Sequence, residues 1–252
     1  MGEYIEINGI STWFQDRGSG EPVVLLHGGL VDGRDFDGNL AGLDTGHRVL
    51  VPDRRAHGRS HDDGGPLALD TLAADSAMFI ETVVGSRVAL VGYSAGTMVA
   101  LRVAIRRPEL VDRLVLISGA FDPAGMLLRP SLDGPPPADL VQAHGEVSPY
   151  GADHFDSVLR RIVDSVDRDA PLSEAEVSTI CCPTLVMCAD DDLVGLEHVL
   201  ATYRAIPDSR LAVIPGTSHV LLHEKPDVCR AVVADFLAAP DVTTFMPIRR
   251  AG

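Results

Sequence analysis

The chain has 252 residues, 46% of them hydrophobic, which is enough to bury the core of one domain with an insertion. Its formal net charge of -15, without any block of Lys and Arg, argues against nucleic-acid binding and disfavours highly anionic substrates. No apolar run approaches the roughly 20 residues that cross a bilayer, and residues 1–11 lack the pattern of an export signal. We therefore expect a cytoplasmic protein without membrane contact, whose four cysteines are reduced.

The N-terminal third of the chain predicts a hairpin, two buried strands and a helix. Residues 3–16 alternate loosely in polarity around Asn8-Gly9, as an antiparallel hairpin at a sheet edge does. Two short β-branched runs, 23–26 and 49–51, predict strands buried on both faces. Apolar residues at helical spacing over 67–84 predict a helix that ends at Gly85.

A polar turn, 53–60, follows the second of these strands. Asp53 and His57 lie within it, and we expect them to hold the turn through local hydrogen bonds rather than to take part in catalysis. The arginines of this turn are expected to be solvated rather than to bind phosphate: Arg54, Arg55 and Arg59.

The stretch 87–106, RVALVGYSAGTMVALRVAIR, is the one around which the chain is organised. Its first part predicts a buried strand, and after Ser94 the apolar residues return at helical spacing until Pro108. Between the two parts, residues 92–96 fit the pattern G-x-S-x-G. A turn this sharp strains its central residue and presents the side chain beside a helix N-terminus, so Ser94 is the candidate nucleophile.

The second half of the chain continues the alternation of predicted strands and helices after one irregular segment. Strands alternating with helices predict an α/β fold with a mostly parallel, doubly wound sheet covered by helices on both faces. Residues 121–179 break the rhythm with several prolines, and we interpret them as a lid inserted between two parts of one core, 1–120 and 180–239. The other predicted elements are strands at 114–117, 184–187 and 211–214, helices at 153–166, 199–206 and 228–237, and a loose tail at 240–252.

A serine hydroxyl is a weak nucleophile unless a base removes its proton and an acid fixes that base. Candidates for both follow predicted strands. Asp190-Asp191-Asp192 comes directly after the strand 184–187, and His219 follows the strand 211–214 through the turn 215–218. Since parallel strands end at one edge of a sheet, we expect these side chains to lie near Ser94.

Several motifs, in the order in which they occur along the chain, resemble those of the α/β-hydrolase fold superfamily, in particular its serine esterase-like members with a lid insertion. The resemblance covers nearly all of the chain apart from the predicted lid and tail. It implies Ser94 as nucleophile, His219 as base and Asp192 as acid, with Asp190 as the alternative acid because Ala189 replaces the family's glycine. The motifs are HGG at 27, DRRAHGRS at 53, GYSAG at 92, ADDDLV at 189, GTSH at 216 and EKPD at 224.

The same resemblance implies an oxyanion hole made by the backbone N–H groups of Ala95 and Gly29, with Leu30 as the alternative second donor. His27 is then a structural hydrogen-bonding residue behind the loop. The lid side chains would serve equally as pocket walls or as packing between lid and core. The residues expected to contact substrate are Leu30, Tyr93, Leu127, Tyr150, Phe155 and Val194.

Together these features predict a serine hydrolase without a cofactor, which cleaves a carboxylic ester, lactone or thioester through an acyl-enzyme. Three alternatives would use the same site: a C–C bond hydrolase, a cofactor-free haloperoxidase or perhydrolase, and a slow-turnover ligand-binding module. No metal ion is expected, because His219 and His223 have no third ligand nearby. The expected partner is a small ester-like molecule, and the chain could form homo-oligomers.

Overall fold

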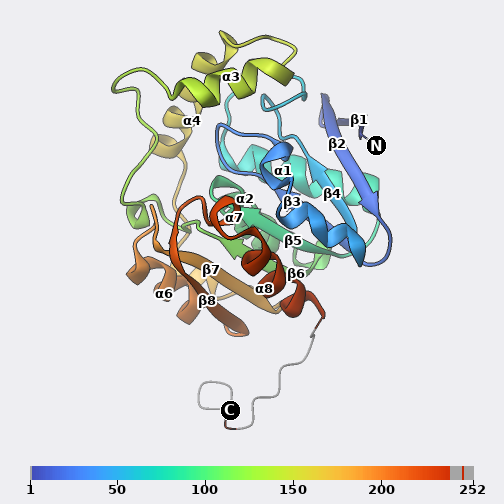
Figure 1. Cartoon of the computed structure of the whole chain (residues 1–252), viewed down its shortest axis with the longest axis vertical. Helices are drawn as coiled ribbons and strands as arrows, with labels where there is room; N and C mark the ends of the chain where they lie inside the picture. The colour runs from blue at the N-terminus through green and yellow to red at the C-terminus, as the bar shows by residue number, and fades with distance from the viewer. Residues whose placement is uncertain (1, 239–245, 247–252) are drawn as a thin grey trace.

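An eight-stranded sheet forms the middle of the computed structural model, which describes residues 2–238 and 246 (Figure 1). Its strands are β1 (Gly2–Ile7), β2 (Ile10–Gly18), β3 (Pro22–Leu26), β4 (Arg48–Pro52), β5 (Val88–Tyr93), β6 (Val111–Ile117), β7 (Thr184–Asp191) and β8 (Ser209–Ser218). They lie in the order β1-β2-β4-β3-β5-β6-β7-β8. The hairpin β1-β2 joins β4 antiparallel, and all pairs from β4 to β8 are parallel. The predicted α/β class and edge hairpin are confirmed.

Helices cover both faces of this sheet, as predicted. The α-helices of the described residues are α1 (Leu69–Phe79), α2 (Ala95–Arg106), α3 (Ala138–Val147), α4 (His154–Arg168), α5 (Glu174–Val177), α6 (Leu196–Ala205), α7 (Leu221–Glu224) and α8 (Pro226–Ala238), of which α3 and α4 lie away from the sheet faces. The buried cluster on one face includes side chains of α1, α2 and α6, and that on the other includes side chains of α7, α8 and the 3-10 turns 33–36 and 40–45.

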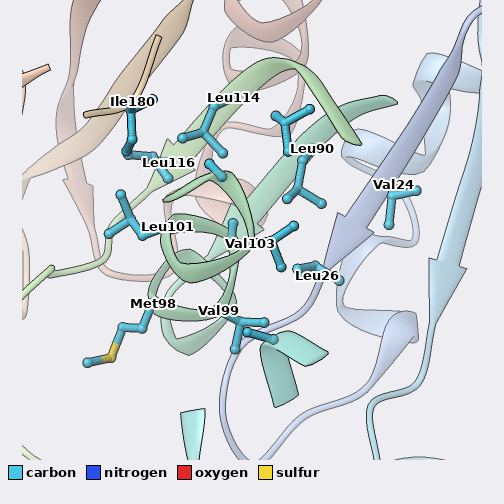
Figure 2. Close-up of a cluster of buried hydrophobic side chains, with 14 of the residues drawn as sticks. Val24, Leu26, Leu90, Met98, Val99, Leu101, Val103, Leu114, Leu116 and Ile180 are labelled. Carbon is cyan, nitrogen blue, oxygen red and sulfur yellow. The ribbon is translucent and has the colours of Figure 1, made fainter. Parts of the chain in front are cut away.

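The strand side chains divide between these two clusters with a period of two. In β3, Val24 and Leu26 belong to the cluster that includes α2 (Figure 2), while Val23 and Leu25 belong to the cluster on the opposite face. All four side chains are fully buried. A strand covered on both faces must be apolar at successive positions, which is why these strands show no polar alternation in the sequence.

Strands β7 and β8 run further than the sequence predicted. Residues 215–218 were expected to form a turn, but β8 continues through them to Ser218. The Asp190 carboxylate accepts hydrogen bonds from the N–H groups of Gly216 (2.9 Å) and Thr217 (3.0 Å), which ties the extended ends of the two strands together. The strand pairing shifts register between Ala189 and Asp191, just before the predicted catalytic acid.

The predicted lid, residues 121–179, lies between strands β6 and β7 of the sheet. Helices α3 and α4 lie together at one end of the molecule, at the top of Figure 1. Helix α3 was not predicted, because three prolines directly before it suggested irregular chain. Leu172 and Val177 are buried in the cluster under α2, so this last part of the predicted lid packs with the core. The predicted tail at 240–252 lies outside the described residues apart from Met246.

Within the part of the chain that the structure describes, no helix is long and apolar enough to cross a membrane. The four cysteines are free thiols, as predicted.

A polar network joins α4 to the turn before α1. The Asp62 side chain is only 6% exposed and accepts hydrogen bonds from His154 Nε2 (2.6 Å) and from the Arg161 guanidinium (2.8 Å from Nη1). Burial acts to raise the pKa of Asp62, but the bonds from Arg161 and His154 outweigh it and hold the pKa well below its usual range. The network therefore fixes α4 to the core through one buried carboxylate.

We expect Asp62→Asn to lower the free energy of unfolding by about 2 kcal/mol at pH 7, because it removes a charged acceptor from two partly buried donors. Since the pKa of Asp62 is lower in the folded state, its contribution is full above the unfolded value of about 3.9 and is lost as the pH falls below it. Urea denaturation at pH 7 and at pH 3 measures both effects. Exposed Asp139 on α3 supplies the control Asp139→Asn, and equal stability of Asp62→Asn and the wild type at pH 7 would contradict the assignment.

Helix α2 lies unusually close to β3 at its first turn. A Cβ atom placed on Gly96 would lie 2.0 Å from the carbonyl oxygen of Leu26 and 2.7 Å from that of His27. Both contacts are with backbone, so no side chain can move aside. The glycine at 96 is therefore required by the packing of the helix on the sheet.

Gly96→Ala should cost about 3 kcal/mol of stability or prevent folding, because the added methyl group forces α2 away from β3. Gly46→Ala is the matched control, since a Cβ atom at Gly46 meets nothing within 4 Å and the φ angle there is -138°. Circular dichroism during chemical denaturation compares the two variants. A Gly96→Ala protein as stable as Gly46→Ala would show that the close approach is not a constraint.

Candidate active site

The turn between β5 and α2 holds Ser94 in a rarely occupied backbone conformation, with φ 53° and ψ -120°. The N–H of Ser94 donates to the carbonyl of Ile117 (2.8 Å), and the Thr97 hydroxyl bonds the carbonyls of Gly92 and Ile117. A Cβ atom on Gly92 would lie 2.4 Å from the carbonyl oxygen of Gly96. The small residues predicted from G-x-S-x-G are thus the ones that make room for a strained serine.

His219 lies between Ser94 and Asp192. Its Nε2 is 2.9 Å from Ser94 Oγ, and its Nδ1 is 2.8 Å from Asp192 Oδ1. With the carboxylate ionised, Nδ1 carries the hydrogen and Nε2 accepts from the serine hydroxyl. The structure thus brings together the three side chains that the sequence predicted to lie at one sheet edge, and the carboxylate against the imidazole belongs to Asp192 and not to Asp190.

Several donors fix the Asp192 carboxylate. Its Oδ2 accepts hydrogen bonds from the Ser118 hydroxyl and the N–H of Ala189, and its Oδ1 accepts from the N–H of Val194 (3.3 Å). Burial acts to raise the pKa of Asp192, but the hydrogen bonds from His219 and Ser118 outweigh it, so the pKa lies below its usual value. The carboxylate is therefore ionised at neutral pH. Ser118, which has a positive φ of 48°, was not singled out from the sequence.

The residues predicted to form the oxyanion hole lie beside the serine turn. A Cβ atom on Gly28 would be 3.4 Å from Ser94 Cβ, and one on Gly29 would be 3.5 Å from Ala95 Cβ. Ala95 is the first residue of α2, so its N–H has no carbonyl partner within the helix. Gly29, Leu30 and Ala95 all line the same cavity as Ser94.

This cavity has a volume of about 390 Å³ and opens over Ser94 and His219. Most of its walls are apolar side chains from α1, α2, α4 and the loops at 126–130 and 193–194. Met98 lies one helical turn after Ser94 and so faces the same side, a spacing from which it could have been found in the sequence. The main apolar walls are Leu30, Leu67, Leu69, Leu72, Met98, Met126, Leu128, Leu140, Ile162, Val166, Leu193 and Val194.

Four of the six residues predicted to contact substrate do not line this cavity. Leu127 is 75% exposed: Met126 pairs with Val194 in an extended bridge, so Met126 and Leu128 face the cavity and the residue between them points away. Tyr150 places its hydroxyl against His61 and Asp62.

The other two serve as packing residues. Phe155 is buried against His144, so it holds α4 onto α3. Tyr93 stacks on the His219 ring at 5.8 Å, and its hydroxyl donates to the His219 carbonyl (2.8 Å). Tyr93 thus supports His219 from behind. Of the six predicted residues, only Leu30 and Val194 reach the cavity.

The turn at 53–60 is buried rather than solvated. Asp53 accepts a hydrogen bond from the N–H of Arg59 (2.9 Å) within the turn, as predicted, and a second one from the N–H of Gly33 (2.8 Å), which lies in another loop. Arg54 and Arg55, however, are both buried, so the prediction of solvated arginines is wrong for them. The reason is that this turn lies beneath the loop at 27–29, where the N–H of Arg54 donates to His27 Nε2 (3.0 Å).

Among the residues that the structure describes, no group of three His, Cys, Asp or Glu side chains is arranged to hold a metal ion.

Comparison with known proteins agrees with this architecture. A putative carbamate hydrolase, RutD, from Klebsiella pneumoniae is 28% identical over 87% of this chain and 92% of its own length. A non-heme haloperoxidase from Rhodococcus erythropolis is 29% identical over 91% of this chain and 97% of its own length. The crystal structure of the enol-lactonase from Burkholderia xenovorans LB400 superposes with a TM-score of 0.77 at 22% identity, covering 94% of this chain and all of that one.

The family model of the alpha/beta hydrolase family matches residues 23–232, which include every strand from β4 to β8 and all three side chains of the Ser94 site. The chain therefore belongs to the alpha/beta hydrolase family.

Proposed function

We propose that this chain is a serine hydrolase that cleaves carboxylic esters or lactones through an acyl-enzyme. The observation that carries the proposal is the continuous line of hydrogen bonds from Ser94 through His219 to Asp192 at the wall of an apolar cavity. Such a line turns a weakly nucleophilic hydroxyl into a reactive one, because the base is already in contact with the proton that it must remove.

In the proposed reaction, Ser94 Oγ attacks the carbonyl carbon of the substrate while its proton moves to His219 Nε2. The imidazolium so formed is stabilised by Asp192, whose carboxylate stays ionised. The N–H groups of Ala95 and Gly29 bind the negative oxygen of the tetrahedral intermediate. When the intermediate collapses, His219 returns the proton to the departing alkoxide and Ser94 keeps the acyl group. A water molecule, deprotonated by His219, then releases the acid.

Perhydrolysis is the second candidate, and the non-heme haloperoxidase among the similar proteins favours it. Hydrogen peroxide would replace water in the last step, giving a peracid and free Ser94. Peracid formation from an ester in the presence of peroxide tests this candidate, and a rate below that of hydrolysis at equal nucleophile concentration would reject it.

Ser94→Ala should reduce hydrolysis of 4-nitrophenyl butyrate by at least about 10⁴-fold, because no other hydroxyl of the described residues is hydrogen-bonded to the His219 imidazole. Intact mass spectrometry should show one fluorophosphonate adduct on the wild type and none on Ser94→Ala. Ser178→Ala, at the end of α5, is the control and should label normally. Unlabelled wild-type protein would instead indicate a ligand-binding module.

Asp192→Asn should lower kcat by about 10³- to 10⁴-fold, since an amide does not hold the His219 tautomer that accepts from Ser94. Asp190→Asn should lower it by less than about tenfold, because the Asp190 carboxylate accepts hydrogen bonds from the backbone N–H groups of Gly216 and Thr217 and from no catalytic side chain of the described residues. Steady-state kinetics of the two variants compares two carboxylates that lie two residues apart at the end of β7. A larger loss in Asp190→Asn would reverse the assignment of the acid.

A further inference from the structure

The charged residues that line the catalytic cavity are all cationic. They are Arg54, which is buried in the wall, and Arg129, which is exposed at the rim. The chain carries 36 acidic residues and a net charge of -15, yet no Asp or Glu of the described part lines this cavity. The local charge of the cavity is thus opposite to that of the whole chain.

Arg54 is the more informative of the two because it is buried without a counterion. It is 6% exposed, and no carboxylate of the described residues lies within ion-pair distance of it. Arg55 and Arg102 are similarly buried, but they pair with Asp75 (2.7 Å) and Asp70 (3.1 Å) respectively. A buried charge without a partner is costly, so a missing anion is indicated at Arg54 and not at the other two.

Only some of the N–H groups of the Arg54 guanidinium are hydrogen-bonded to the described residues. Its Nη2 donates to the carbonyl of Gly28 (2.6 Å) and lies 3.3 Å from His27 Nδ1. Its Nε is buried and has no hydrogen-bond partner among the described residues. Burial lowers the pKa of Arg54 to about 10, which leaves the side chain protonated at neutral pH. Nη1 is not among the buried atoms and makes no hydrogen bond to the described residues, so a charged donor of this cavity-lining side chain remains available beside the loop that carries Gly29.

His57 adds an unpartnered acceptor to the same wall. Its Nδ1 lies 2.9 Å from the carbonyl of Arg55, so Nδ1 must carry the hydrogen and Nε2 the lone pair. That Nε2 is buried and has no partner within the described part of the chain, and His57 is one of the residues that line the cavity. Burial, and after it the charge of Arg54, lowers the pKa of His57 to about 3, so the ring is neutral. It can accept a hydrogen from a hydroxyl group or a bound water.

We propose that Arg54 and His57 form an anion subsite in the catalytic cavity, and that the substrate is an ester or lactone bearing a free carboxylate. Arg54 binds the carboxylate, and His57 accepts from a hydroxyl or water beside it. This inference rests on the proposed hydrolase function for the identity of the reacting group, but the binding of the carboxylate can be measured without catalysis. The hydrogen bond from Arg54 to the Gly28 carbonyl places the subsite next to the proposed oxyanion hole.

Matched pairs of activated esters test the subsite in the active enzyme. Mono-4-nitrophenyl glutarate and 4-nitrophenyl valerate have acyl chains of equal length, and only the glutarate ester carries a terminal carboxylate. The corresponding esters of succinate and butyrate form a shorter pair, and those of adipate and caproate form a longer pair. For each pair we take the ratio of kcat/KM for the anionic ester to kcat/KM for the neutral ester. In the pair for which the wild type prefers the anionic ester, Arg54→Met should reduce this ratio by about 10- to 100-fold.

Two further variants separate charge from structure. Arg54→Lys keeps the charge and should retain the ratio within about threefold, since it loses only the planar donor geometry. Arg59→Met removes an arginine of the same turn that pairs with Asp53 (3.8 Å) and does not line the cavity, and it should leave the ratio unchanged. An equal loss on both esters in Arg54→Met would show that Arg54 only supports the Gly28 loop, and would overturn the proposal.

Binding to the Ser94→Ala protein tests the subsite independently of turnover. Isothermal titration with succinate, glutarate and adipate should detect at least one dicarboxylate that binds tenfold or more tightly than the monocarboxylate of equal length. Adding Arg54→Met to Ser94→Ala should abolish that preference. If none of the three dicarboxylates is preferred, the subsite is rejected even when Ser94 is labelled by a fluorophosphonate. If a preference is found but the wild type hydrolyses no ester, the subsite stands and the hydrolase function fails.

Discussion

The close contact between α2 and β3 is the constraint on which the rest of the site depends. Because the backbone at Gly96 lies against the Leu26 carbonyl, the chain leaving β5 has room only for a sharp turn, and Ser94 takes a φ of 53°. A non-glycine residue in such a conformation costs on the order of 1–3 kcal/mol. The bond from the Ser94 N–H to Ile117 and the two bonds of the Thr97 hydroxyl offset this cost. The hydroxyl is thereby held clear of the sheet at the start of a helix.

The topology of the sheet then determines what this hydroxyl meets. The chain leaves β3 toward one face of the sheet and leaves β5 toward the other, so a crevice opens between the carboxyl ends of these neighbouring strands. Strands β5 to β8 are each followed directly by one residue of the hydrogen-bonded network: Ser94, Ser118, Asp192 and His219. Four separate segments are thus held in register by the parallel ladder itself.

This arrangement explains which features could be predicted from the sequence. Ser94, Asp192 and His219 follow apolar runs whose buried character is a local property, and the parallel sheet brings their ends together. The cavity walls depend instead on which way each side chain of an irregular segment points. Leu127 and its neighbour Met126 are equally apolar, and only the pairing of Met126 with Val194 decides which of the two faces the substrate. That pairing joins residues far apart in the chain and has no local signal.

The burial of Arg54 was missed for a related reason, since a cluster of arginines in a polar turn is ordinarily solvated. The argument from net charge also averages over 36 acidic residues, none of which, in the described part, lines the cavity. The net charge of the surface and the charge of Arg54 act over different distances. Repulsion of an anion by the surface is screened beyond about 8 Å at physiological ionic strength. The Arg54 guanidinium lies in a poorly hydrated wall and acts on a carboxylate that is in contact with it. Composition therefore governs how often an anion reaches this protein, and the single side chain at 54 governs whether the cavity retains it.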